Sequence, residues 1–424
     1  MLPEPRLDHA RQLDAADPLR AFRDRFELPR DERGEPLVYL AGHSLGLAPK
    51  SARARVLEEL EDWARLGVLG HEHSRRPWLH YHEQLTAPLA ALAGARAGEV
   101  IAMNALTINL HLMLASFYRP QGRRTKILME AGAFPSDRHA VSSQIAWHGL
   151  SPDTELIELA PAQGADTLRE ADIEALLSRR GAEIALVWWP GVQYLTGQSF
   201  DLARIARAAR EAGCVVGFDL AHSIGNVPLA LHDSGADFAV WCGYKYLNGG
   251  PGALGGCFIA ERHGAPGAVP RLSGWWGNET ATRFQMRPQF QPAAGAAGWQ
   301  VSNPPILSSA PLIASLEIFA EAGMARLRQK SLALSALLDE LVRDLPVEPL
   351  TPRASAARGC QLSLRLPGDA ARSERILERL TQRGVITDRR EPDVLRVAPV
   401  PLYNRFEDVV RFADELAQAL RPAS

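Results

Sequence analysis

Short apolar runs alternate with segments of helical periodicity through the middle of the chain. Runs of strand length lie at residues 126–130, 184–189, 214–220, 238–243 and 256–260. Between them lie segments such as 201–212, where Asp201 is placed to cap a helix and Gly213 is placed to end it. Short apolar strands that alternate with helices are typical of a mainly parallel sheet covered on both faces. The pattern therefore predicts an α/β protein built on such a sheet.

The rest of the chain follows other patterns. Residues 271–305 are rich in Gly, Pro, Trp and Asn, which indicates a long irregular segment, and 307–345 predicts a long helical stretch. The final part alternates between strand and helix over residues 361–366, 371–383, 385–388, 395–400 and 406–420. A chain of 424 residues exceeds the roughly 250–300 residues at which a single core stops growing. We therefore expect an N-terminal segment 1–50 that packs with the small domain, a large domain 51–306 and a small α+β domain 307–424.

Composition and charge narrow the kinds of partner. The chain carries 47 basic and 49 acidic side chains and a net charge of -2, which gives nucleic acid or an anionic membrane no electrostatic reason to bind. Its four cysteines are far apart and form no Cys-x-x-Cys pair, so we expect free thiols in a reducing compartment and no metal. The N-terminal residues contain no apolar signal-peptide region, and no run approaches the roughly 18 apolar residues of a membrane span. These features predict a cytoplasmic protein.

Two charged residues beside apolar strands carry the strongest chemical signal. Asp219 closes one run, and Lys245 follows another, just before Gly249 and Gly250. Ligands in open α/β sheets bind beyond the carboxyl ends of the strands. A lysine there forms an imine with the aldehyde of pyridoxal phosphate, and a carboxylate keeps the pyridine nitrogen protonated so that the ring accepts electrons. Alone, Asp219 is as readily a loop cap, and Lys245 an exposed loop lysine, so it is the pair that indicates the cofactor.

Other residues near strand ends each allow two interpretations. Thr107 starts an apolar helical run, where free N–H groups favour a phosphate, although a plain helix cap explains it too. Phe134 either stacks on a cofactor ring or packs in the core. Arg396 interrupts a strand-like run and pairs with a substrate carboxylate or with a structural acid. His222 fits a structural loop histidine, and Tyr244 fits a donor to the cofactor phosphate or a proton shuttle.

Taken together, the motifs resemble the kynureninase family of fold-type I pyridoxal phosphate enzymes. The shared motifs are Gly42-His-Ser-Leu-Gly46, Asn104-Ala-Leu-Thr-Ile-Asn-Leu-His111, Phe134-Pro-Ser-Asp137, Gly191-Val-Gln-Tyr-Leu-Thr-Gly197, Gly217-Phe-Asp-Leu-Ala-His222, Tyr244-Lys-Tyr-Leu-Asn248, Ser302-Asn-Pro-Pro305 and Arg396-Val-Ala-Pro-Val-Pro-Leu-Tyr403. They occur in order over most of the chain, which argues against coincidence. The resemblance implies the fold-type I architecture, in which a large domain with a mainly parallel sheet carries a smaller α+β domain.

The resemblance also assigns roles to single residues. It implies that Lys245 forms the imine with the cofactor, that Asp219 meets the pyridine nitrogen and that Phe134 lies against the ring. The remaining positions of the family's cofactor shell are matched here by Leu106, Thr107, Asp137, His222 and Tyr244, as the resemblance implies. Trp275 and Asn303 resemble positions that reach the cofactor or substrate from the second subunit of a homodimer. The residues that resemble the family's substrate-side positions are Ser44, His71, Asn303 and Arg396.

The chain departs from the family pattern at two places. His43 stands where the family often has asparagine. Pro190 stands where some relatives have a serine, and proline has neither a hydroxyl nor an N–H group to offer. The contact that this serine would make is therefore missing or replaced by a backbone group or water.

The implied reaction is hydrolysis of the Cβ–Cγ bond of L-kynurenine or 3-hydroxy-L-kynurenine to anthranilate or 3-hydroxyanthranilate and L-alanine, in tryptophan degradation or NAD biosynthesis. Lys245 would move the Cα proton, Asp219 would maintain the electron sink, and Tyr244 would supply or relay a proton. His71 and Asn303 are polar groups that can bond a ring hydroxyl, so we expect 3-hydroxykynurenine to be the better substrate.

Other functions have weaker support. Another fold-type I enzyme, such as a cysteine desulfurase or an aminotransferase, would share Lys245 and Asp219, but no loop cysteine is placed to carry a persulfide. A cofactor-free α/β binding protein would not need the intact set of Lys245, Asp219 and Thr107. A nicotinamide-dependent enzyme is disfavoured because no Gly-x-Gly-x-x-Gly motif follows the early strands.

Overall fold

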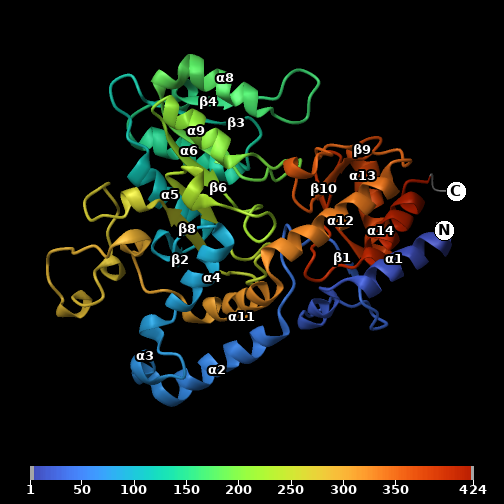
Figure 1. Cartoon of the computed structure of the whole chain (residues 1–424), viewed down its shortest axis with the longest axis horizontal. Helices are drawn as coiled ribbons and strands as arrows, with labels where there is room; N and C mark the ends of the chain where they lie inside the picture. The colour runs from blue at the N-terminus through green and yellow to red at the C-terminus, as the bar shows by residue number, and fades with distance from the viewer. Residues whose placement is uncertain (1–3, 422–424) are drawn as a thin grey trace.

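The computed structural model, which describes residues 4–421, places a large and a small β-sheet in separate parts of the molecule (Figure 1). Within these residues the large sheet has seven strands in the order β2-β8-β7-β6-β5-β3-β4. They are β2 (Val100–Met103), β3 (Lys126–Glu130), β4 (Leu156–Leu159), β5 (Ile184–Pro190), β6 (Val215–Asp219), β7 (Phe238–Trp241) and β8 (Gly255–Ile259). Strands β3 to β7 run parallel, whereas β8 is antiparallel to β2 and β7. The predicted α/β class with a mainly parallel sheet is confirmed.

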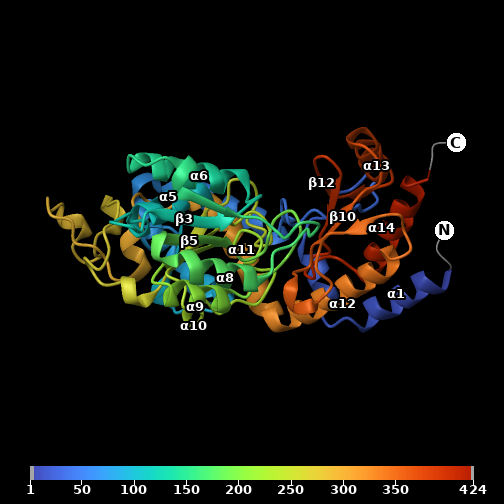
Figure 2. The same cartoon turned by 90° about the horizontal axis from the view of Figure 1, so that it is seen from above.

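Helices cover both faces of the large sheet (Figure 2). They are α4 (Glu83–Ala93), α5 (Leu106–Phe117), α6 (Pro135–Trp147), α7 (Pro152–Glu155), α8 (Glu170–Arg180), α9 (Leu202–Glu211) and α10 (Leu231–Ser234). Neighbouring strand residues enter opposite cores: Trp188 packs with α5 and α6, whereas Trp189 packs with α4, α8 and α9. Because both faces are buried, the strands are continuously apolar. The predicted cap of α9 is also present, since the Asp201 carboxylate accepts a hydrogen bond from the Arg204 N–H at 3.0 Å.

The small sheet contains residues from the end of the chain and is covered by helices from both ends. Its strands lie in the order β12-β13-β10-β9 and are antiparallel. The elements of this part are β9 (Glu348–Pro349), β10 (Leu362–Arg365), α13 (Ala370–Gln382), β11 (Val385–Ile386), β12 (Asp388–Arg390), β13 (Val394–Val397) and α14 (Phe406–Ala419). The N-terminal helix α1 (Glu4–Ala16) packs on α14, and β1 (Val38–Tyr39) pairs in parallel with β11. The domain boundaries proposed from the sequence stay a prediction.

The long helix expected at 307–345 is instead two helices, α11 (Ile306–Ala322) and α12 (Met324–Val342). Gly323 separates them with a φ of +75°, a conformation that glycine adopts without strain, and the two axes meet at 83°. Helix α11 packs in the large part against α2 (Lys50–Leu66), while α12 packs against α14 in the small part. Among the described residues no single helix is long and apolar enough to cross a membrane. The bent pair of α11 and α12 reaches the required length and apolar composition only when the two helices are taken together.

The irregular segment predicted at 271–305 is present and projects from the end of the large part, opposite the small domain (Figure 1). It contains short 3-10 turns at Trp275–Gly277, Arg283–Gln285 and Gly295–Trp299. The short helix α3 (Gly70–His73) follows α2 on the same side of the molecule. This end carries exposed apolar side chains, among them Val68, Leu69, Phe284 and Met286.

Candidate active site

The carboxyl ends of β3, β5 and β6 meet the first turns of α5 and α6 at one pocket. The pocket is lined by Leu106, Thr107, Met129, Glu130, Ala133, Phe134, Ser136, Asp137, Trp188, Pro190, Val192, Tyr194, Asp219, Ala221, His222, Tyr244 and Lys245. The residues that the sequence assigned to a cofactor within one subunit all belong to this lining. The topology explains the convergence, because parallel strands bring their carboxyl ends to the same edge of the sheet.

Two carboxyl groups lie at the floor of the pocket. Asp219 is the last residue of β6, and its Oδ1 accepts a hydrogen bond from the Ala221 N–H at 2.8 Å. Trp188 donates its indole N–H to Oδ2 of the buried Asp137 at 3.0 Å, whereas Oδ1 of Asp137 has no partner in the described structure. Burial raises the pKa of both carboxyl groups; Asp219 raises that of Asp137 further, while the Lys245 charge lowers that of Asp219. Two buried carboxyl groups at the floor of the pocket suit a protonated pyridine nitrogen, which would donate a hydrogen bond to Asp219 and bring a positive charge to the pair.

Lys245 lies at the other side of the pocket. Its amine nitrogen Nζ is 3.0 Å from Nε2 of His222 and 5.8 Å from the centre of the Phe134 ring. Burial, and next the nearby Lys245 charge, lower the pKa of His222 well below its ordinary value, so this imidazole is neutral. An amine held against a neutral base, with an aromatic face beside it, suits imine formation with an aldehyde whose ring stacks on Phe134.

The first turns of α5 and α6 form a third wall. Thr107 is the second residue of α5, Ser136 is the second of α6, and their hydroxyl oxygens lie 2.8 Å apart. Free backbone N–H groups and the helix dipoles favour an anion here, as a phosphate group requires. The sequence analysis did not single out Ser136. The sequence nevertheless indicates its position, because Ser136 directly follows Pro135, and proline often occupies the first position of a helix.

Two further lining residues were missed from the sequence. Glu130 ends β3 and is only 3% exposed, and burial raises its pKa to about 8. Tyr194 packs edge-on against the Phe134 ring at 5.3 Å, and its carbonyl accepts a hydrogen bond from Arg396 at 2.8 Å. Tyr194 stood inside a recognised motif, but only the fold shows that it links the pocket to the small domain.

Arg396 is buried in β13 and has two protein partners. Its Nη2 donates to the Asp388 carboxylate at 2.5 Å and its Nη1 to the Tyr194 carbonyl, while its Nε has no partner in the described structure. The structural ion pair considered from the sequence is therefore present. Arg390 also contacts Asp388, at 3.2 Å, so two guanidinium groups share one carboxylate. Ser44 lies in the turn whose glycine, Gly46, donates its N–H to the Tyr244 carbonyl.

Three predicted residues lie away from Lys245 within this chain. His71, Trp275 and Asn303 line a groove of about 420 Å³ at the end of the large part. The other lining residues are Val68, Leu69, Glu72, Leu79, Trp276 and Phe284. None of these belongs to the lining of the Lys245 pocket. A single copy of the chain does not bring the three residues to the cofactor site.

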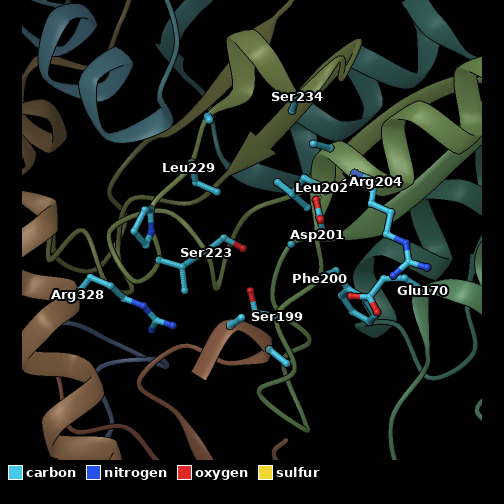
Figure 3. Close-up of a pocket in the computed structure, with 17 residues that line it drawn as sticks. Glu170, Ser199, Phe200, Asp201, Leu202, Arg204, Ser223, Leu229, Ser234 and Arg328 are labelled. Carbon is cyan, nitrogen blue, oxygen red and sulfur yellow. Dashed lines mark hydrogen bonds between the residues drawn. The ribbon is translucent and has the colours of Figure 1, made fainter. Parts of the chain in front are cut away.

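A larger hollow, of about 610 Å³, lies among the segments that follow β5 and β6 (Figure 3). Ser199, Ser223 and Arg328 are among the residues that line it. Two of its charged groups already have protein partners: the Asp201 carboxylate caps α9, and Arg204 pairs with Glu174 at 2.6 Å. Size alone therefore does not locate the chemistry, which requires the lysine, the carboxyl pair and the helix N-termini of the smaller pocket.

Solved structures share this fold, and one of them holds pyridoxal phosphate. A C-DES variant with glycine covalently linked to the cofactor superposes with a TM-score of 0.76 at 21% identity, covering 89% of this chain and 96% of that one. The cystine C–S lyase C-DES in complex with cysteine persulfide gives 0.77 at 21% identity, covering 90% and 97%. This likeness shows the fold. The fold and the site together define the chain as a fold-type I enzyme that uses pyridoxal phosphate as its cofactor.

Sequence relatives narrow the class. The kynureninase of Myxococcus xanthus is 56% identical over 410 residues, and that of Xanthomonas campestris pv. campestris is 55% identical over 411, each covering 96% of both chains. A model of the kynureninase C-terminal domain matches residues 327–416. The chain therefore belongs to the kynureninase family and is a hydrolase that acts on carbon–carbon bonds.

Proposed function

We propose that this enzyme hydrolyses the Cβ–Cγ bond of 3-hydroxy-L-kynurenine and L-kynurenine, releasing the aryl acid and L-alanine. The observation that supports this most strongly is the Lys245 amine, 3.0 Å from His222 in the pocket floored by Asp219 and Asp137. This arrangement suits an amino-acid substrate held on pyridoxal phosphate. Family membership identifies the amino acid as a kynurenine.

Each side chain of the pocket has a separate role in holding the cofactor or in moving a proton. Bound pyridoxal phosphate supplies an aldehyde for the substrate amine and a ring that takes up electrons as bonds to the substrate carbon atoms break. Asp219 holds a proton at the pyridine nitrogen through a charge-assisted hydrogen bond. Lys245 moves the proton at the substrate Cα, and the neutral His222 orients the lysine amine. Thr107 and Ser136 hold the phosphate at the two helix N-termini.

Tyr244 is suited to donate a proton rather than to accept one. Burial raises the pKa of its phenol, so the hydroxyl stays protonated at neutral pH. We place this proton at the γ-ketone or at Cβ. Tyr244→Phe should therefore slow turnover, with the cofactor still bound as judged by absorbance. Turnover equal to that of the wild type would remove Tyr244 from the proton path.

The exposed apolar end of the large part supports a homodimer. Val68 is 78% exposed, Leu69 57%, Phe284 55% and Met286 73%, and they surround or adjoin the groove that holds His71, Trp275 and Asn303. Apolar side chains gathered in this way favour a protein partner. A second copy related by a two-fold axis would cover this surface and let the groove residues enter its partner's site.

Mixing two inactive variants tests the shared site. One carries Lys245→Ala, and the other carries both His71→Ala and Asn303→Ala. If the groove residues act across the interface, a mixed dimer contains one site with all wild-type groups, and activity reappears on mixing. If they act within their own subunit, every site in the mixture keeps a defect and no activity returns.

The same groove supports the ring preference. The His71 imidazole and the Asn303 amide are polar, exposed groups that can hydrogen-bond a hydroxyl on the substrate ring. A site that contains such groups penalises the substrate that lacks the hydroxyl, because its polar groups are then left unpaired. We therefore propose 3-hydroxykynurenine as the better substrate.

Release of the aryl acid tests both the proposed reaction and the proposed preference for 3-hydroxykynurenine. The purified protein, with and without added pyridoxal phosphate, is given each kynurenine, and release of anthranilate or 3-hydroxyanthranilate is followed by fluorescence. Release of either acid supports the reaction, and a higher kcat/KM for plain kynurenine would refute the ring preference. A yellow, cofactor-loaded protein that releases neither acid would move the function to another reaction of the fold.

A cysteine desulfurase is the nearest alternative, but it would need a reactive cysteine thiolate, and the four thiols of this chain do not favour one. Cys214, Cys242, Cys257 and Cys360 are all buried, and burial raises the pKa of each thiol, which disfavours the reactive thiolate. The place of the reaction in tryptophan degradation or NAD biosynthesis, and the cytoplasmic location, stay predictions from the sequence.

A further inference from the structure

The turn that follows β1 joins the two halves of the proposed site. Ala41 pairs with Ala398, just beyond β13, so one end of the turn is attached beside the strand that carries the buried arginine. Gly46 donates its N–H to the Tyr244 carbonyl at 2.9 Å, so the other end is attached beside the reactive lysine. His43 stands at the centre of this turn. Its position follows from two backbone attachments and does not depend on side-chain packing alone.

The His43 side chain is fully buried, yet neither ring nitrogen has a hydrogen-bond partner among the described residues. The centre of its ring lies 6.4 Å from that of His222, which contacts the Lys245 amine. Its Nε2 lies 3.8 Å from the Asp388 carboxylate, which pairs with Arg396. A buried imidazole without partners is costly unless a group outside the protein uses its nitrogens.

The charges around His43 identify the kind of group that is missing. Arg390 and Arg396 share the single carboxylate of Asp388, which leaves one positive charge of the cluster without an acid. Burial lowers the pKa of His43 well below its ordinary value, and the charges of Arg396, Lys245 and Arg390 lower it further. The imidazole is therefore neutral and offers one N–H donor. A ligand group with one negative charge and a free lone pair would complete the cluster.

We propose that His43 is a substrate-binding residue whose neutral imidazole donates a hydrogen bond to the α-carboxylate of the amino-acid substrate, beside Arg396. The proposal rests on the function proposed above. In an α-amino acid the carboxylate and the amine are bonded to the same carbon atom, so the carboxylate lies close to the amine that replaces Lys245 on the cofactor. A series of neighbours leads from that lysine through His222 to His43, and from His43 through Asp388 to Arg396. It fixes the carboxylate and takes no part in breaking the Cβ–Cγ bond.

Binding of a non-cleaved amino acid tests the proposal directly. L-Alanine and L-alaninamide are titrated into the holoenzyme, and the change in cofactor absorbance gives Kd for each. His43→Leu removes the donor at similar size and should weaken L-alanine roughly 10- to 100-fold, the value of one hydrogen bond to a charged group. His43→Asn keeps an N–H donor and should stay close to the wild type. The amide carries no negative charge, so its Kd should change much less between the three proteins than the Kd of L-alanine.

Two results would overturn the proposal. L-Alanine bound by His43→Leu as tightly as by the wild type would show that the imidazole makes no such contact. An equal loss for L-alanine and for the amide would show a structural role instead. If His43→Leu does not fold, His43→Ala replaces it with the same expected ratio of the two Kd values. Failure of the wild type to release an aryl acid would refute the reaction alone, because the titration requires no cleavage.

Discussion

Asp388→Asn should change stability and substrate binding in opposite directions. Arg396 is 1% exposed and Asp388 13% exposed, and their contact is 2.5 Å long. Removing one partner of a buried ion pair costs about 3–5 kcal/mol, but asparagine keeps an oxygen that accepts a hydrogen bond. We therefore expect a loss of about 1–3 kcal/mol in the free energy of unfolding. The two arginines lose their shared acid at the same time, so the affinity for L-alanine should rise roughly tenfold.

Thermal unfolding of the holoenzyme and the L-alanine titration measure the two effects. Asp166→Asn is the matched control, because Asp166, in the loop before α8, pairs with Arg365 of β10 in the small sheet and both side chains are about one-third exposed. An exposed pair contributes about 0–1 kcal/mol, so this variant should unfold near the wild-type temperature. Equal losses in the two variants would refute the buried pair. Unchanged or weaker binding of L-alanine by Asp388→Asn would refute the charge argument.

Two further variants address the cofactor pocket. Burial raises the pKa of Glu130 from 4.5 to about 8, so this carboxyl group favours folding most below about pH 4.5 and loses that contribution as the pH rises through 8. Glu130→Gln should therefore flatten the fall of the unfolding temperature between about pH 4.5 and 8, and an unchanged slope would contradict the shift. Ser136→Ala should weaken binding of pyridoxal phosphate to the apoenzyme by roughly five- to tenfold, about 1 kcal/mol. Ser143→Ala removes a hydroxyl that bonds only within the same helix, and it should leave that affinity unchanged; equal effects of the two serine variants would remove Ser136 from the phosphate site.

The sequence predicts the large sheet well because its signals are local. Buried strands are continuously apolar, and the strand that ends at Asp219 places its carboxylate at the ligand edge whatever the surrounding loops do. The break at Gly323 has no such signal. Both α11 and α12 are rich in apolar residues, so the pattern continues across the break, and a single glycine inside a helix is tolerated.

Contacts between distant residues explain what the sequence left open. Arg396 had two equally supported partners, a substrate carboxylate or a structural acid. The structure pairs it with Asp388 and with the Tyr194 carbonyl, 202 positions away. Local patterns carry no information about a partner at that distance. Glu130 was missed for a related reason: a strand of five residues that ends in glutamate is common, and only the assembled pocket shows that the carboxyl group is buried.

The attachment of the N-terminal segment to the end of the chain has a consequence for the order of folding. Asp14 accepts a hydrogen bond from the Phe406 N–H, 392 positions away, and β1 pairs with β11, near the end of the described chain. Contacts this distant in sequence form slowly, because a very long loop must close first. The large sheet uses nearer partners, so we expect the lysine pocket to form early and the carboxylate-binding turn at His43 to dock last. A refolding chain should therefore acquire the yellow colour of bound cofactor before it acquires affinity for amino acids.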